Sequence, residues 1–185
     1  MHIISGKYKH RNLITPKGLD TRPTTNRLRE TLFNICQNYV QEARFLDLFA
    51  GSGAMGFEAL SRGASSATFV DSHRESILAI KHNVQALDVR QQAHVIQGDV
   101  FSILQRLEKQ GVQFDIIYAD PPYSKGLSEQ LLAFLDQHPL LLPNGYLFIE
   151  ESSDVKLPYA ELKTLHLVSE RATGRAALLQ FKKTI

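Results

Sequence analysis

The segment Asp120-Pro121-Pro122-Tyr123 combines residue types that could hold an exocyclic amine. Two consecutive prolines fix φ at about −65° and remove two backbone donors, so the carbonyl groups of this segment can only accept hydrogen bonds. The Asp120 carboxylate and the Pro121 carbonyl could accept the two N–H hydrogens of an amino group, while the Tyr123 ring stacks on the base that carries it. The alternative is a plain turn that ends the preceding strand, which leaves Asp120 and Tyr123 unexplained.

A second chemical feature is a glycine-rich loop after an apolar strand. Residues 51–56 follow the pattern G-x-G-x-x-G, in which glycines let a ligand approach the backbone closely. Asp71, twenty residues beyond the first glycine, is placed to accept hydrogen bonds from two ribose hydroxyls. Asp47 would repel a pyrophosphate but suits a ligand amine. S-adenosylmethionine has a ribose and an α-amino group and no phosphate, so we predict it as the cofactor.

Asp99 follows the third predicted strand at the same edge of the sheet. It could accept a hydrogen bond from an adenine amino group or cap the helix that follows, and the two roles are compatible. The predicted catalytic residues are Asp120, Pro121, Pro122 and Tyr123. The predicted cofactor contacts are Asp47, Phe49, Ala50, Gly51, Ser52, Gly53, Asp71, Ser72, Asp99, Val100 and Asp120.

The elements that must position these residues alternate along the chain. Short apolar runs predict strands at 44–49, 67–70, 93–97, 114–119 and 146–150. Between them, apolar residues three or four apart predict helices near 54–63, 73–87, 100–110 and 126–137. This alternation predicts a parallel sheet with helices on both faces. The runs at 162–168 and 176–182 predict an antiparallel hairpin that closes one edge of the sheet.

The amino-terminal part of the chain is basic. Residues 1–31 hold seven Lys or Arg against two acidic residues, a net charge of +5, whereas residues 32–185 carry −3. A basic extension on a mildly acidic body is typical of proteins that hold a polyanion, although a solvated charged face is the alternative. Apolar spacing predicts a helix that starts near Thr24 or Thr25 and runs through Val40. The predicted RNA contacts are Lys7, Lys9, Arg11, Arg22, Thr24, Arg27 and Arg29.

Length and composition bound the class of protein. A chain of 185 residues, 43% hydrophobic and 22% charged, excludes disordered and fibrous classes and predicts one domain at 41–185 with a small extension at 1–40. No apolar run approaches the roughly 20 residues that cross a bilayer. The single cysteine, Cys36, favours a reducing compartment, so we expect a cytoplasmic protein. We also expect a monomer. The seven histidines show no ligand-like spacing with Cys36, so no metal is expected.

The segment at 120–123 resembles the (D/N)-P-P-(Y/F) signature of class I S-adenosylmethionine-dependent methyltransferases that act on planar amines. Residues 21–34, 46–53 and 58–64 resemble the bacterial 16S ribosomal RNA guanine-N2 methyltransferases, and this resemblance extends over nearly the whole chain. The chain departs from the pattern at Ser5, where a second glycine is expected, and at Thr173, where an aromatic residue is expected. The resemblance implies a Rossmann-like α/β fold with a mostly parallel seven-stranded sheet. It also implies a loop guanine of 16S rRNA, in the assembled or assembling small subunit, as the substrate.

Three alternatives stay open at the level of sequence. The first is the same chemistry on another planar amine: adenine N6, cytosine N4 or a glutamine side-chain amide. The basic extension, and a chain too short for a separate target-recognition domain, favour RNA over these. The second is a nicotinamide oxidoreductase that uses the loop at 51–56. The third is an RNA-binding module without catalytic activity. The presence of the acidic site residues and of Tyr123 argues against this alternative.

Overall fold

The structure is a computed structural model, and it describes residues 1–16, 26–122 and 126–184. The described residues form five α-helices and seven strands. The helices are α1 (Asn26–Cys36), α2 (Ala54–Ser61), α3 (Arg74–Leu87), α4 (Val100–Lys109) and α5 (Leu127–Gln137), with a short 3-10 helix, η1 (Tyr159–Glu161). The strands are β1 (Arg44–Leu48), β2 (Ser66–Asp71), β3 (Ala93–Gln97), β4 (Phe114–Ala119), β5 (Leu141–Ser152), β6 (Leu165–Thr173) and β7 (Ala176–Lys183). The predicted alternation of strands and helices is confirmed.

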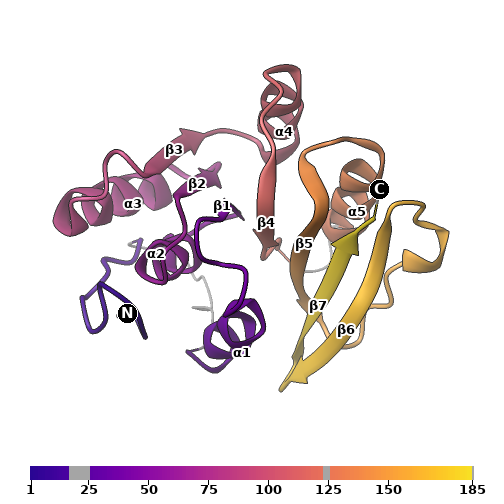
Figure 1. Ribbon diagram of the computed structural model, residues 1–185, viewed down its shortest axis with the longest axis horizontal. Helices are drawn as coiled ribbons and strands as arrows, with labels where there is room; N and C mark the ends of the chain where they lie inside the picture. Colours follow the sequence, from indigo (N-terminus) through magenta and orange to yellow (C-terminus); the bar gives the residue numbers. More distant parts are fainter. Residues whose placement is uncertain (17–25, 123–125, 185) are drawn as a thin grey trace.

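All seven strands belong to one sheet in the order β3-β2-β1-β4-β5-β7-β6. The five strands from β3 to β5 are parallel, whereas β7 runs antiparallel to both β5 and β6. The carboxyl-terminal hairpin therefore closes one end of the sheet as predicted, with its second strand placed inward (Figure 1). Strand β1 lies between β2 and β4, so the direction of winding reverses between β1 and β4.

The sheet separates two apolar cores. One face packs against α1, α2 and α3, and its core includes Leu28, Phe57 and Ile80. The other face packs against α4 and α5, and its core includes Leu104 and Leu132. Helices therefore cover both faces of the sheet, as the alternation of strands and helices predicts. Helix α2 is buried along its whole length rather than along one stripe.

Helix α1 is shorter than the apolar spacing predicts. It ends at Cys36, where the N–H groups of Tyr39 and Val40 both donate to the Cys36 carbonyl at 2.9 Å and close the helix in a turn. Tyr39 and Val40 still pack against the same core, which explains why their spacing resembles that of a longer helix. The predicted capping residues Thr24 and Thr25 lie outside the described residues.

The first strand of the hairpin begins later than predicted. The apolar run starts at residue 162, but β6 starts at Leu165. The N–H groups of Lys163 and Thr164 donate to the Asp136 carboxylate at 2.9 and 2.7 Å, which binds this stretch to the end of α5 rather than to β7. Although burial alone would raise it, these hydrogen bonds lower the pKa of Asp136 to about 2.

The amino terminus folds back on itself as a small hairpin over residues 1–14, which we call the arm hairpin. The Ile3 N–H donates to the Arg11 carbonyl at 3.0 Å, and the Leu13 N–H donates to the Met1 carbonyl at 2.8 Å. Ile3 and Leu13 are buried in the core beneath α1, α2 and α3. The arm hairpin thus packs on that face of the sheet, close to α2 (Figure 1). The functional division at residue 40 stays a prediction.

Two further observations concern the chemistry that the described residues can support. Among residues 1–16, 26–122 and 126–184, no helix is long and apolar enough to cross a bilayer. Within the same ranges, no group of three or more His, Cys, Asp and Glu side chains could hold a metal ion.

Cys36 is buried, and burial raises the pKa of its thiol to about 12, so it is a core residue rather than a nucleophile.

Candidate active site

Acidic side chains gather where the parallel strands end. Strand β1 pairs in register with β2 and β4, and β4 pairs with β5. The last pairs join Leu48 to Val70 and Ala119, and Ala119 to Ile149. The residues that follow them, Asp71, Phe49, Asp120 and Glu150, therefore form a row at the ends of four adjacent strands, which lie about 4.8 Å apart. The row crosses the point between β1 and β4 where the winding reverses, and open α/β sheets bind ligands there. The sequence predicts this edge as the site.

The carboxylates of this row face the side of the sheet that carries the arm hairpin, whereas Phe49 packs against the opposite core. Tyr118 and Phe148 belong to the core beneath α1, α2 and α3. Side chains two residues apart along a strand point to the same face, so Asp120 and Glu150 lie on this side as well. The Tyr118 hydroxyl donates to the Glu150 carboxylate at 3.1 Å, in agreement with this placement.

The three glycines of the loop have different physical roles. Gly51 and Gly53 have φ values of +54° and +76°, a region that glycine enters freely. A Cβ built on Gly51 would meet nothing within 4 Å, so its backbone faces open space, as a ligand contact requires. A Cβ on Gly56 would lie 2.3 Å from the Phe69 ring, so this glycine permits α2 to pack closely on the sheet. Phe49 also has a positive φ of 57°, which costs about 1–2 kcal/mol for a residue with a side chain.

Asp47 lies beneath the loop rather than at its surface. Its side chain is 1% exposed, and its Oδ2 accepts a hydrogen bond from the Gly56 N–H at 3.0 Å. Burial, together with the negative charges of Asp71 and Asp120, raises the pKa of Asp47 well above its ordinary value, although the Gly56 N–H opposes this. Asp47 therefore holds the start of α2 against β1, and its predicted contact with a ligand amine stays a prediction.

Asp71 joins the end of β2 to the glycine loop. Its Oδ2 accepts from the Gly51 N–H, and its Oδ1 accepts from the His73 N–H, each at 2.8 Å. Each carboxylate oxygen retains a second acceptor position, so a contact with ribose hydroxyls is compatible with these bonds. Asp71 is thus positioned by the loop that it is predicted to complete.

Asp99 caps α4, as the sequence-based alternative proposes. Its Oδ2 accepts from the N–H and the hydroxyl of Ser102 at 2.9 and 3.0 Å. The side chain is exposed, and Val100, the first residue of α4, is buried. The adenine contact of Asp99 stays a prediction. Of the other predicted cofactor residues, Ser72 is exposed, Phe49 is half-buried, and Ala50 and Ser52 are buried.

Asp120 is half-buried at the end of β4. Burial, together with the charges of Glu150 and Glu151, raises its pKa to about 8. Pro121 is buried and Pro122 is exposed, whereas Tyr123 lies outside the described residues. Asp120 therefore sits in a negative environment that favours a cationic ligand over an anionic one.

Glu150 and Glu151 are two further acidic residues of the site that are not among the predicted site residues. Both are buried in β5, and Glu151 accepts hydrogen bonds from the Ser128 hydroxyl at 2.6 Å and the Ser152 N–H at 2.8 Å. A signal for them existed, because two adjacent acidic residues follow the apolar run at 146–149 directly. Buried carboxylates at the end of a parallel strand belong to the same edge as Asp71 and Asp120.

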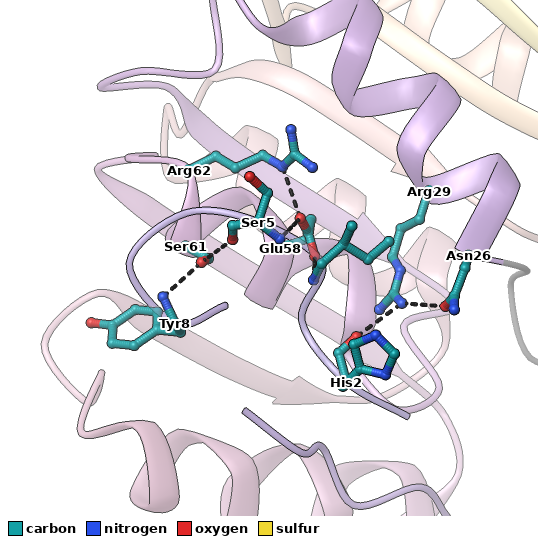
Figure 2. A network of polar contacts seen from close by, with 9 residues as sticks. His2, Ser5, Tyr8, Asn26, Arg29, Glu58, Ser61 and Arg62 are labelled. Atoms are coloured by element: carbon teal, nitrogen blue, oxygen red, sulfur yellow. Dashed lines mark hydrogen bonds and ion pairs between the residues drawn. The ribbon is translucent and has the colours of Figure 1, made fainter. Parts of the chain in front are cut away.

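The predicted RNA contacts divide into exposed, buried and undescribed residues. Lys7, Lys9, Arg11 and Arg27 are exposed. Arg29 is fully buried: it donates to the His2 carbonyl at 3.0 Å and to the Asn26 side chain at 2.7 Å (Figure 2). Its predicted contact with RNA phosphate is therefore wrong for this conformation, because the guanidinium joins α1 to the arm hairpin instead. Arg22 and Thr24 lie outside the described residues.

A buried glutamate holds the arm hairpin against α2 (Figure 2). The Glu58 carboxylate accepts from the Ile4 and Ser5 N–H groups at 2.8 and 3.0 Å, and from Arg62 Nε at 2.8 Å. Ser61 adds a second attachment, because its hydroxyl accepts from the Tyr8 N–H at 2.9 Å and donates to the Ser5 carbonyl. Helix α2 starts at the glycine loop, so the same helix carries the loop at one end and the arm hairpin along its length.

The fold and the site together define a class I methyltransferase fold. The chain is similar in structure to the Escherichia coli protein yhhF, with a TM-score of 0.86 at 33% identity, covering 100% of this chain and 98% of that one. SMU.776, whose structure is complexed with SAH, matches with a TM-score of 0.68 at 16% identity over 83% of this chain and 49% of that one, which supports the fold alone.

The family model described as "Conserved hypothetical protein 95" matches residues 1–182, and the chain belongs to this family. A Haemophilus influenzae relative named "Ribosomal RNA small subunit methyltransferase D" is 36% identical, covering 94% of this chain and 89% of the relative. An Escherichia coli K12 relative of the same name is 33% identical, covering 99% of this chain and 90% of the relative. The predicted family resemblance is confirmed.

Proposed function

We propose that this protein uses S-adenosylmethionine to methylate the exocyclic N2 amine of a guanine in a loop of 16S rRNA, in the assembled or assembling small subunit. The proposal depends above all on the row at the carboxyl edge, where Asp71 beside the open glycine loop and Asp120 flank the reversal point. The names of the Haemophilus influenzae and Escherichia coli relatives support small-subunit ribosomal RNA as the substrate class.

The residues of the site fit S-adenosylmethionine better than a dinucleotide. A pyrophosphate requires free N–H groups at the helix start after the glycine loop. Here the Gly56 N–H is taken by the Asp47 carboxylate, and Asp71 adds further negative charge. When bound, S-adenosylmethionine would supply a methyl group on a positively charged sulfur. Gly51 and Asp71 would hold the cofactor. A thermal shift with S-adenosylhomocysteine but not with NAD would distinguish the two cofactors.

Asp120 and Pro121 would orient the amine. A guanine N2 amine is a poor nucleophile because its lone pair is delocalised into the ring. Two acceptors on its N–H groups would fix its orientation and favour the positive charge that develops on nitrogen. Alignment of two reactants lowers the activation barrier by on the order of 7–11 kcal/mol. This effect is larger than that of a general base, which typically accelerates a reaction by about 10²–10⁴-fold. After transfer, the acidic N–H would lose its proton to Asp120 or to water.

The decisive test is mass spectrometry of ribosomal RNA from cells with and without this protein. We expect one N2-methylguanosine of 16S rRNA to disappear when the gene is removed and to return when the purified protein and S-adenosylmethionine are added to small subunits. Loss of N6-methyladenosine or N4-methylcytosine instead would favour the alternative amines. An unchanged nucleoside profile would refute an RNA substrate.

The raised pKa of Asp120 predicts a pH dependence. The carboxylate form of Asp120 accepts hydrogen bonds from the amine. Because the pKa of Asp120 is raised to about 8, this side chain is mostly protonated in the free protein at a pH below 8. We therefore expect kcat/KM for RNA to rise up to about tenfold per pH unit below 8 and to level off above it. Bound S-adenosylmethionine carries a positive charge, so it would shift the midpoint of the pH profile of kcat to lower pH. In Asp120→Asn this rise should vanish; a flat wild-type profile from pH 6 to 9 would exclude the role.

The exposed cations of the arm hairpin predict salt-dependent RNA binding. Replacing Lys7, Lys9 and Arg11 with alanine should weaken RNA binding at least tenfold and reduce the slope of log K against log salt by about 2, because each neutralised phosphate releases counterions. A matched triple variant changes Arg106, Lys109 and Lys156, which are also exposed but are not among the predicted contacts. It should bind like the wild type. An unaltered slope in the first variant would remove the arm hairpin from the interface.

A further inference from the structure

We propose that Asn83 is a positioning residue that couples RNA binding at the arm hairpin to cofactor binding at the glycine loop. The inference rests on the proposed function in two respects, that S-adenosylmethionine binds at the glycine loop and that RNA binds at the arm hairpin. It adds a mechanism by which occupancy of one site changes the affinity of the other.

The amide of Asn83 bridges two segments that are far apart in the sequence. The side chain lies on α3 and is 1% exposed. Its Oδ1 accepts from the Ile14 N–H at 2.8 Å, and its Nδ2 donates to the Ile14 carbonyl at 2.9 Å. The same Nδ2 donates to the Ser52 carbonyl at 3.3 Å. One buried, planar group therefore holds both the end of the arm hairpin and the middle of the glycine loop.

The other end of the arm hairpin reaches the same loop. The Ser52 hydroxyl donates to the Met1 sulfur at 3.5 Å, and Met1 pairs with Leu13 across the hairpin. The two ends of the hairpin thus meet at Ser52, whereas its tip, with exposed Lys7 and Lys9, lies near the carboxyl end of α2. A ligand that fixes the loop also fixes the carbonyl to which Asn83 donates.

Few other side chains could make this bridge. An amide offers an acceptor and two N–H donors on one rigid plane, so it can pair with the N–H and carbonyl of Ile14 and still reach Ser52. An unpaired Ser52 carbonyl in this buried position would be unfavourable, and one rigid amide makes all three bonds, so a displacement of Asn83 disturbs them together. Because coupling between two binding sites is reciprocal, the cofactor should order the arm hairpin, and RNA on the arm hairpin should tighten cofactor binding.

Hydrogen exchange of the arm hairpin tests the coupling without RNA. We expect saturating S-adenosylhomocysteine to slow exchange at Ile3, Leu13 and Ile14 by about tenfold in the wild type, within the range typical of coupled sites. In Asn83→Leu, which keeps the volume but not the hydrogen bonds, the change should fall below twofold. Gln85→Leu makes the same exchange of amide for aliphatic on the exposed side of α3 and should respond like the wild type.

A second variant covers the case in which Asn83→Leu does not fold. Asn83→Asp keeps the acceptor for the Ile14 N–H but cannot donate to Ile14 or Ser52. Isothermal titration of S-adenosylhomocysteine should show about tenfold tighter binding with a 16S rRNA fragment present in the wild type, and less than twofold in Asn83→Asp. Wild-type coupling in either variant would overturn the proposal, as would no response of the wild-type arm hairpin to bound ligand. Failure of the wild type to bind S-adenosylhomocysteine at all would instead refute the proposed cofactor.

Discussion

Asp120→Ala is expected to reduce methyl transfer by about 10³-fold while the affinity for S-adenosylhomocysteine changes less than about threefold. Asp120 directly follows β4, whose last residue, Ala119, pairs with Leu48 at the end of β1. In the proposed function it contacts the amine rather than the ribose, which Asp71 is placed to bind. Its loss therefore removes the alignment of the amine and leaves the glycine loop with its Asp47 and Asp71 contacts intact.

Single-turnover methylation of small subunits and titration of S-adenosylhomocysteine measure these two quantities separately. Asp115→Ala is a matched control on the same strand: Asp115 forms a partly exposed ion pair with Arg44 at 3.4 Å, at the opposite end of β4. Exposed pairs of this kind contribute about 0–1 kcal/mol, so the control should retain wild-type turnover. Wild-type turnover in Asp120→Ala itself would contradict the assigned role.

Glu58→Ala is expected to destabilise the protein by about 3–5 kcal/mol, the range for breaking a buried ion pair. The side chain is fully buried, and its removal leaves the Ile4 and Ser5 N–H groups and Arg62 without their acceptor. For a chain of this size, the midpoint of thermal unfolding should fall by roughly 6–20 °C. The Ile4 and Ser5 amides should also lose their protection against hydrogen exchange, because the carboxylate that accepts their hydrogen bonds is removed.

Calorimetry and hydrogen exchange on the same samples check this expectation. Glu58→Gln keeps one acceptor oxygen and should lose less stability than Glu58→Ala. Glu30→Ala removes an exposed carboxylate from α1 and should change the unfolding midpoint by no more than about 2 °C. A Glu58→Ala protein with wild-type stability and wild-type protection of Ile4 would show that the arm hairpin is held by its apolar residues alone.

Local sequence patterns were sufficient for the parts of the site that come from contiguous residues. The apolar run before Gly51 and the one before Asp120 predict parallel strands, and parallel strands bring their carboxyl ends to one edge. The glycine spacing predicts open backbone at the loop, and Gly51 has it. The capping alternative for Asp99 is likewise local, since it depends only on a residue three positions ahead.

The misplaced predictions share a cause. Arg29 counts as a cation in the sequence, but the hairpin that buries it is formed by residues 1–14, and α1 must pack on them before its guanidinium meets the His2 carbonyl. The early end of α1 and the late start of β6 depend in the same way on where the chain turns back onto the core. Charge and periodicity contain no information about which distant backbone groups a side chain will reach.

The α/β class, the edge of the sheet that carries the site, and the acidic and glycine-rich segments at that edge could all be predicted from the amino-acid sequence, because each depends on spacing within a few residues. The three-dimensional fold was needed to show that Glu150 lies close enough to Asp120 to raise its pKa, that Glu58 and Asn83 attach the arm hairpin, and that Arg29 is buried. These contacts join residues separated by 27 to 69 positions. Hydrogen bonds and charges act over a few ångströms in space, so such pairs exist only once the sheet has brought the segments together.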